Sequence, residues 1–321
     1  MSGPPSSSAA RRARPPARVG GAARLVGLAR TSYLEATRQP IYGAALLGGL
    51  VAVALAPALA VFAIGEADAF VLDLGASALL SFSAFLAAVA VGAGAAERFG
   101  DGTTGLLLTH PVGPGTVLLG QLLGGALALF QAGLLLSLVL LWAVRHGPQE
   151  LHWGVLSCAL AAGSGAALWG ARASLARRPF QPAALRAATV LFPLAFVISL
   201  RLGPSAEPLG RWASTLPAAP SAAYLAVLAG LPFAGLGLLL ATRLGAGASA
   251  AGTLLAFLAA SLPSPYPTPL PDLQLFWVGD AAYSGASVPG GYLGAMTLYA
   301  LAYALGCAVL GGASLSAREV A

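Results

Sequence analysis

The sequence predicts an all-α membrane protein whose chain crosses the bilayer about eight times. Of its 321 residues, 58% are hydrophobic and 9% are charged, whereas a typical soluble domain has about 25% charged residues. The mean hydropathy is +0.81. Several uncharged runs reach the roughly 20 residues that an α-helix needs to cross the hydrocarbon core. A transmembrane β-barrel would show short alternating segments instead, and these runs are continuous.

The chain begins with residues 1–23, which are rich in Ser, Pro, Ala, Gly and Arg and predict a disordered basic tail. A signal peptide is not favoured, because the first apolar run starts late and is too long for the apolar part of such a peptide. Residues 24–40 predict an amphipathic helix at the cytoplasmic interface. Pro40 ends or kinks this helix. The alternative is that the segment simply extends the first span.

The membrane domain is expected over residues 41–313, followed by a cytoplasmic tail over 314–321. The eight predicted spans are 41–64, 74–96, 117–144, 152–169, 187–200, 222–242, 248–262 and 291–310. The fifth span is the shortest, and Pro193 interrupts it. With the N-terminus in the cytoplasm, 14 of the 17 arginines fall on the cytoplasmic side, as the positive-inside rule requires. Both termini are therefore predicted to be cytoplasmic.

A polar segment separates the second and third spans. Its first residues place charged side chains at the end of one helix, and a turn is expected at Gly-Asp-Gly. A short amphipathic stretch follows and ends at His110-Pro111. A loop that only joined two membrane helices would not need these features. The segment over residues 97–116 therefore predicts a docking element at the membrane surface. The expected docking residues are Glu97, Arg98, Asp101, Gly102, Thr103, Thr104, Leu106, Leu107, Leu108, His110 and Pro111.

The sequence excludes ATP hydrolysis by this chain, because it contains no lysine and so has no P-loop. No catalytic or metal motif is present either, so we expect neither an enzyme nor a bound cofactor. His146 and His152 allow a metal relay as an alternative, but interfacial positions at helix ends explain them more simply. The pI near 9.8 does not indicate nucleic-acid binding, because the arginines lie mostly at the ends of spans.

Three blocks in order resemble the membrane subunits, or permeases, of ABC transporters of the ABC-2 type. Residues 29–50 are similar to the interface helix running into the first span of that family. Residues 71–124 are similar to the second span, its coupling segment and the start of the third span, although Gln121 stands where the family usually has Lys. Residues 271–319 are similar to the last outer loop and final span. The segment 151–221 has no counterpart and would be a pair of spans inserted into a six-span plan.

The resemblance implies that residues 97–116 couple the chain to a separate ATP-binding subunit, which would hold ATP and Mg. It also implies that the interface helix acts with this segment, through Arg30, Tyr33, Leu34, Glu35 and Arg38. The expected partners are that ATP-binding subunit, a second copy of this or a related permease, and the lipid bilayer, with no nucleic acid. The expected location is the bacterial inner (plasma) membrane, and the expected direction of transport is export.

Two other functions stay open from the sequence. A membrane scaffold or assembly protein would need no transport cycle and no ATP-binding partner. A secondary transporter is disfavoured, because the predicted spans contain no charged residue near their centres, where proton or ion pathways place such groups.

Overall fold

The computed structural model describes residues 20–60, 67–100, 113–146, 153–201, 217–262, 268–279, 281 and 284–319. These residues form helices and contain no strand, so the predicted all-α class is confirmed. The helices are α1 (Gly21–Ala36), α2 (Pro40–Ala60), α3 (Ala67–Leu86), the π-helix η1 (Ala87–Ala93), α4 (Gly94–Gly100), α6 (Pro114–His146), α7 (Trp153–Leu175), α8 (Phe180–Ser199), α10 (Ala219–Leu228), α11 (Gly230–Ala241), α12 (Ala246–Ala260), the short 3-10 turn η2 (Gln274–Phe276) and α14 (Gly290–Glu319).

Seven helical segments in the described part of the chain are long and apolar enough to cross a membrane. They are Pro40–Ala60, Ala67–Gly100, Pro114–Arg145, Trp153–Leu175, Phe180–Ser199, Ala219–Ala241 and Gly290–Ala317. This number and length of apolar helices is that of a multi-pass membrane protein. The predicted span 248–262 corresponds to α12, which has 15 residues and a length of about 22 Å, less than the roughly 30 Å of a hydrocarbon core.

Three boundaries differ from those expected. The predicted fifth span is the second half of α8, a 20-residue helix that continues through Pro193. The second span begins at Ala67, so Asp68 and Asp73 belong to α3 and not to a loop. An acidic residue in the first turn of a helix is favoured by the helix dipole. The last helix, α14, continues to Glu319 through most of the predicted tail.

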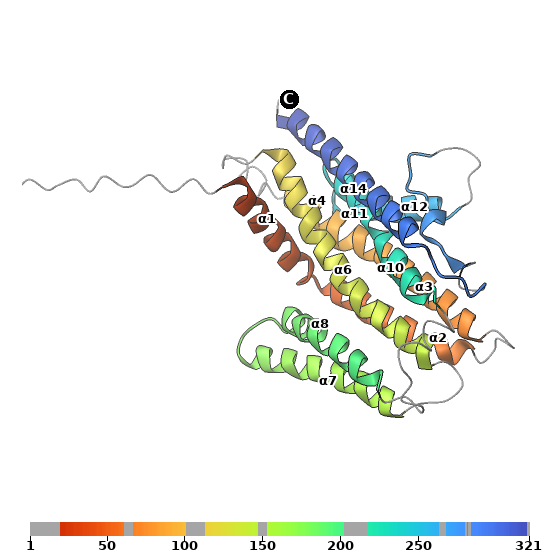
Figure 1. Cartoon of the computed structure of the whole chain (residues 1–321). Coiled ribbons are helices and arrows are strands. Elements are labelled where there is room, and N and C mark those ends of the chain that lie inside the picture. The colour runs from red at the N-terminus through yellow and green to blue at the C-terminus, as the bar shows by residue number, and fades with distance from the viewer. Residues whose placement is uncertain are drawn as a thin grey trace, which may run out of the picture.

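The long helix α6 is the centre of the bundle (Figure 1). It packs against α1, α2, α3, η1, α8, α10, α11 and α14, and fully buried leucines line much of its length, among them Leu118, Leu129 and Leu136. Its remaining face exposes Leu123, Leu127 and Leu134, so the helix is apolar both where it meets its neighbours and where it would meet lipid, and it has no charged residue before Arg145. Figure 1 shows the start of α1, the start of α6 and the end of α14 at the same end of the bundle.

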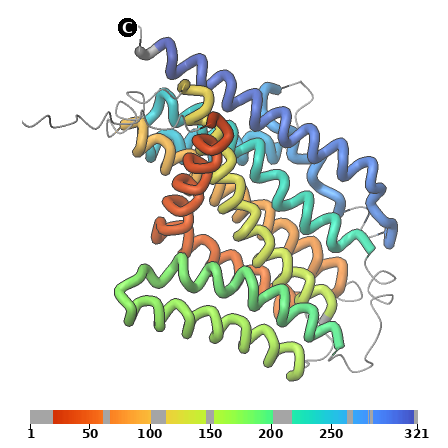
Figure 2. Tube along the Cα trace, turned by 60° about the vertical axis from the view of Figure 1, so that its left-hand side comes forward, coloured from red at the N-terminus to blue at the C-terminus, as the bar shows by residue number. Residues whose placement is uncertain are grey.

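The pair α7–α8 forms a hairpin on the edge of the bundle, and both ribbon views place α8 between α7 and the remaining helices (Figure 2). Trp142 of α6 attaches the hairpin: its Nε1 donates a hydrogen bond of 2.7 Å to Ser199 Oγ, and its ring packs against Phe192 and Phe196. The outer helix α7 exposes Leu160, Leu168 and Trp169. Such an apolar outer surface suits contact with lipid chains, not with water.

Candidate functional site

Helix α1 lies unusually close to α6. Its buried residues are Ala29, Ser32 and Ala36, which are small and lie on one side of the helix. Ala29 and Ser32 face Gly120 and Gly124 of α6. A Cβ atom added at Gly124 would lie 2.3 Å from the carbonyl oxygen of Ala29, and one added at Gly120 would lie 2.5 Å from Leu28 Cβ. Only a glycine hydrogen fits in that space, so these two glycines set the depth at which α1 docks.

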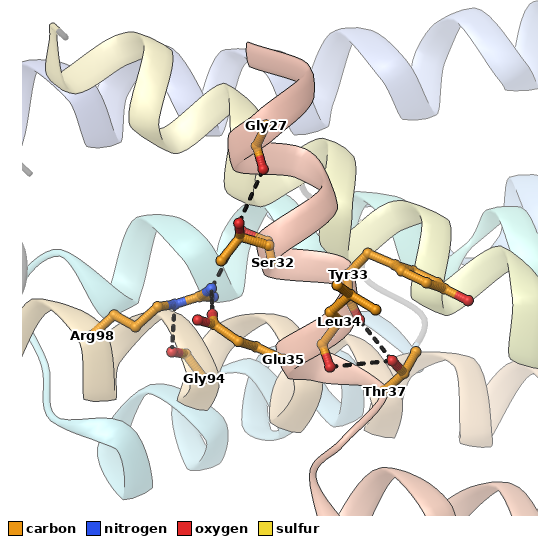
Figure 3. Close-up of polar contacts among 9 residues, drawn as sticks. Gly27, Ser32, Tyr33, Leu34, Glu35, Thr37, Gly94 and Arg98 are labelled. Atoms are coloured by element: carbon orange, nitrogen blue, oxygen red, sulfur yellow. Dashed lines mark hydrogen bonds and ion pairs between the residues drawn. The ribbon is translucent and has the colours of Figure 1, made fainter. Parts of the chain in front are cut away.

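An ion pair joins α1 to α4, at the end of the second predicted span. Arg98 pairs with Glu35, and its Nη1 also donates to Ser32 Oγ at 3.3 Å. Its Nε donates to the Gly94 carbonyl oxygen of its own helix at 3.0 Å, which fixes the guanidinium. Figure 3 shows α1 running across the direction of the helices behind it, with Arg98 reaching it from α4. Helix α1 is therefore attached both to α6, by close packing, and to α4, by charge.

The π-helix η1 sets the direction in which Arg98 points. It lies within one continuous helical segment, Ala67–Gly100, and its wider turn is seen in the bond from the Gly94 N–H to the Val89 carbonyl oxygen, five residues back. A π-turn places an extra residue in a helix and is frequent at functional sites. An α-helix rotates by about 100° per residue, and the wider π-turn accommodates one extra residue without passing that rotation on to the segment that follows. The direction of Glu97 and Arg98 thus depends on η1.

Deleting Val89 is expected to convert η1 to an ordinary α-helix and to leave Arg98 beside Glu35, because the π-turn is what accommodates the extra residue. The measurement is cross-linking of Glu35→Cys to Arg98→Cys with a short bifunctional reagent, in a background where Cys158 and Cys307 are replaced by alanine. The link is expected in the full-length pair and on deletion of Val89, and it is expected to be lost when one alanine is inserted after Ala96, beyond η1, because that insertion rotates Arg98 by about 100°. The control Val89→Ala keeps the chain length and should keep the link. Loss of the link on deletion of Val89, or its survival after the insertion, would contradict this role of η1.

Charged residues of the predicted interface helix and of the predicted coupling segment line one open pocket. It has a volume of about 410 Å³ and lies between α1, the start of α2, η1 and α4. The lining residues are Glu35, Ala36, Arg38, Gln39, Pro40, Ala90, Gly94, Glu97 and Arg98. Glu97 and Arg38 are exposed. The expected interface helix and the beginning of the expected coupling segment therefore meet in space, although about 60 residues separate them in the chain.

A chain of polar contacts connects α1 through α6 to α8. The Tyr33 hydroxyl donates to Gln131 Oε1 at 2.7 Å, and Gln131 Nε2 donates to Thr189 Oγ1 at 2.7 Å. Burial raises the pKa of Tyr33 above its usual value, although its hydrogen bond to Gln131 and the charge of Arg186 act in the opposite direction. The hydroxyl therefore stays protonated and can donate this hydrogen bond at neutral pH.

A side chain of α8 fixes the turn between α1 and α2 by hydrogen bonds. Gln181 Nε2 donates hydrogen bonds of 2.9 Å to the carbonyl oxygens of Thr37 and Gln39. Sequence reasoning missed Gln181 and Gln131, and interpreted the segment 151–221 only as a pair of spans inserted into a six-span plan. The signal was an isolated glutamine in each of two apolar segments, since polar side chains in membrane helices usually bond across helices.

The structure places the predicted site residues in three groups. Glu35, Arg38, Glu97 and Arg98 come together at the pocket. Tyr33 faces Gln131 instead, while Leu34 is half-buried and Arg30 is exposed on α1. The remaining coupling residues lie outside the described residues: Asp101, Gly102, Thr103, Thr104, Leu106, Leu107, Leu108, His110 and Pro111.

No group of three or more His, Cys, Asp or Glu side chains in the described residues is arranged to hold a metal ion. His152 lies outside these residues, as does the side chain of His146. The chain matches no protein-family model, and no curated protein matches it either.

Proposed function

We propose that this chain is the membrane subunit of an ABC transporter of the ABC-2 type and that it couples to a separate ATP-binding subunit. The observation that carries the proposal is the junction of α1 with α4 and α6. Helix α4 ends at Gly100 and α6 begins at Pro114, so these two helices flank the predicted coupling segment. A partner that moved this segment would move both helices, and α1 would follow them through Arg98 and Gly124.

In the proposed complex, two membrane subunits, identical or related, act with two ATP-binding subunits that hold ATP and Mg. The chain would lie in the bacterial inner (plasma) membrane, with both termini in the cytoplasm and about eight crossings if α12 counts as a short span. Transport would be export. The basic residues around the α1–α2 and α7–α8 turns, Arg38, Arg172, Arg177 and Arg178, favour this orientation.

The proposal is tested by co-expressing the chain with the products of its neighbouring genes and purifying it in mild detergent. An ATP-binding protein with ATPase activity is expected to copurify. A chain that purifies alone, under conditions that preserve other such complexes, would favour the scaffold function. Transport that survives ATP depletion and stops when the proton gradient collapses would favour a secondary transporter.

Replacing Leu107 and Leu108 with Asp is expected to abolish recovery of the ATP-binding protein while leaving the chain in the membrane. The reason is that two charges would replace the apolar anchor of a modest interface. The matched control replaces Leu202 and Leu209 with Asp, since these leucines lie in the segment expected on the opposite side of the membrane. Unchanged recovery with the Leu107 and Leu108 replacements would contradict docking at this segment.

A further inference from the structure

The pocket between α1 and α4 lies where a lipid headgroup would be. Helix α2 has 21 residues, and its length of about 31 Å matches the hydrocarbon core, so its ends lie near the two boundaries of the core. Pro40 begins α2 and lines the pocket. Helix α8 begins at the same level, because Gln181 in its first turn holds the carbonyl oxygens of Thr37 and Gln39.

The pocket carries charges of both signs. Glu35 is engaged with Arg98. Arg38 and Glu97 are exposed, and neither forms an ion pair with the residues that the structure describes. Gln39 lies beside them, and its Oε1 is buried without a hydrogen bond in the described part of the chain. A buried acceptor of this kind usually has a donor, so the pocket offers one cation, one anion and one acceptor to a ligand.

We propose that this pocket binds the headgroup of a zwitterionic phospholipid with a primary amine, that is, a phosphoethanolamine group. The phosphate would face Arg38, because guanidinium groups bind phosphate oxygens with strong charge-assisted hydrogen bonds. The ammonium would face Glu97 and donate to Gln39 Oε1. A choline headgroup has no N–H to donate, and its quaternary ammonium is bound by aromatic side chains, of which the pocket lining has none.

An anionic headgroup without an amine suits the pocket less well, because Glu35 and Glu97 would face it. Further along α2 from Pro40, an exposed apolar stripe is formed by residues spaced four apart in the sequence: Leu47, Val51, Leu55 and Leu59. Such a stripe suits contact with acyl chains. The inference needs only that the helices span a membrane, and it does not depend on the proposed transport function.

The test is native mass spectrometry of the full chain in detergent, titrated with dioleoyl phosphatidylethanolamine, phosphatidylcholine or phosphatidylglycerol. We expect the first lipid to bind roughly fivefold more tightly than the other two. This is the upper end of what one exposed ion pair, here between the ammonium and Glu97, contributes to binding. Glu97→Gln should remove this preference, whereas Arg38→Gln should weaken the binding of all three lipids, because each of them carries a phosphate. Both side chains are exposed, so the variants should stay folded, which size-exclusion chromatography verifies. Arg172→Gln, an exposed arginine at the end of α7, is the matched control and should keep the preference.

Soluble glycerophosphoethanolamine distinguishes a lipid from a free headgroup. The lipid site is supported if this compound, at the same concentration, fails to displace the bound lipid. Displacement at equal concentration would show a site for a soluble phosphoamine and would overturn the lipid assignment. Equal binding of the three lipids, strongest binding of phosphatidylglycerol, or an unchanged preference in Glu97→Gln would also overturn it.

Discussion

Gly124→Ala is expected to displace α1 from α6 and to destabilise the protein by about 1–3 kcal/mol, the usual cost of overpacking. The added methyl group would lie 2.3 Å from the Ala29 carbonyl oxygen, 2.6 Å from Ser32 Cβ and 2.8 Å from the Tyr33 N–H nitrogen. Two of these three atoms belong to the backbone, so a change of rotamer cannot make room. The whole helix must move outward, away from α6.

The displacement is measured by hydrogen exchange in α1 and by the thermal midpoint in detergent. Exchange of the α1 amides should rise while that of α10 and α11 should not. The control is Gly163→Ala in α7, where the added Cβ meets nothing within 4 Å and where alanine is a better helix former than glycine by up to about 1 kcal/mol. The close-packing interpretation fails if Gly124→Ala is as stable as Gly163→Ala.

Reversing either charge of the Glu35–Arg98 pair is expected to lower the ATPase activity of the proposed complex by about fivefold or more, the lower range of coupling energies between sites. The effect on stability should be small, at most about 1 kcal/mol, because the two side chains are 47% and 21% exposed. Reduced coupling with nearly unchanged stability is the result that separates a mechanical link from a structural one.

The informative variant is the double exchange, Glu35→Arg with Arg98→Glu, which restores a pair of opposite charges between α1 and α4. Activity should return to a large part of the wild-type value, whereas each single reversal stays low. Arg172→Glu changes charge by the same amount at the end of α7 and serves as the control. If the double exchange is no more active than the single reversals, the pair does not transmit motion between α1 and α4.

Composition and hydrophobic runs were sufficient to predict the helical membrane class. Charged side chains are too costly in a hydrocarbon core to be placed there freely, so long uncharged runs identify most spans before any tertiary contact is known. The end of α1 before Pro40 was predicted for a similar local reason, because proline cannot continue a helix from the preceding turn. The start of α3 was not predicted, because Asp68 and Asp73 were interpreted as loop residues although acids are favoured near helix starts.

Local sequence determined which segments are helical and which residues are polar enough to bond across helices. Only the tertiary structure decided which of them meet. Whether Glu35 reaches Arg98 depends on the extra residue that η1 accommodates and on how closely Gly124 lets α1 approach α6. Both are set by packing between segments far apart in the chain, and neither leaves a periodic signal in the sequence. The sequence alone therefore determined the membrane fold class and the candidate polar residues, while packing around two glycines and one π-turn brought four of those residues into one pocket.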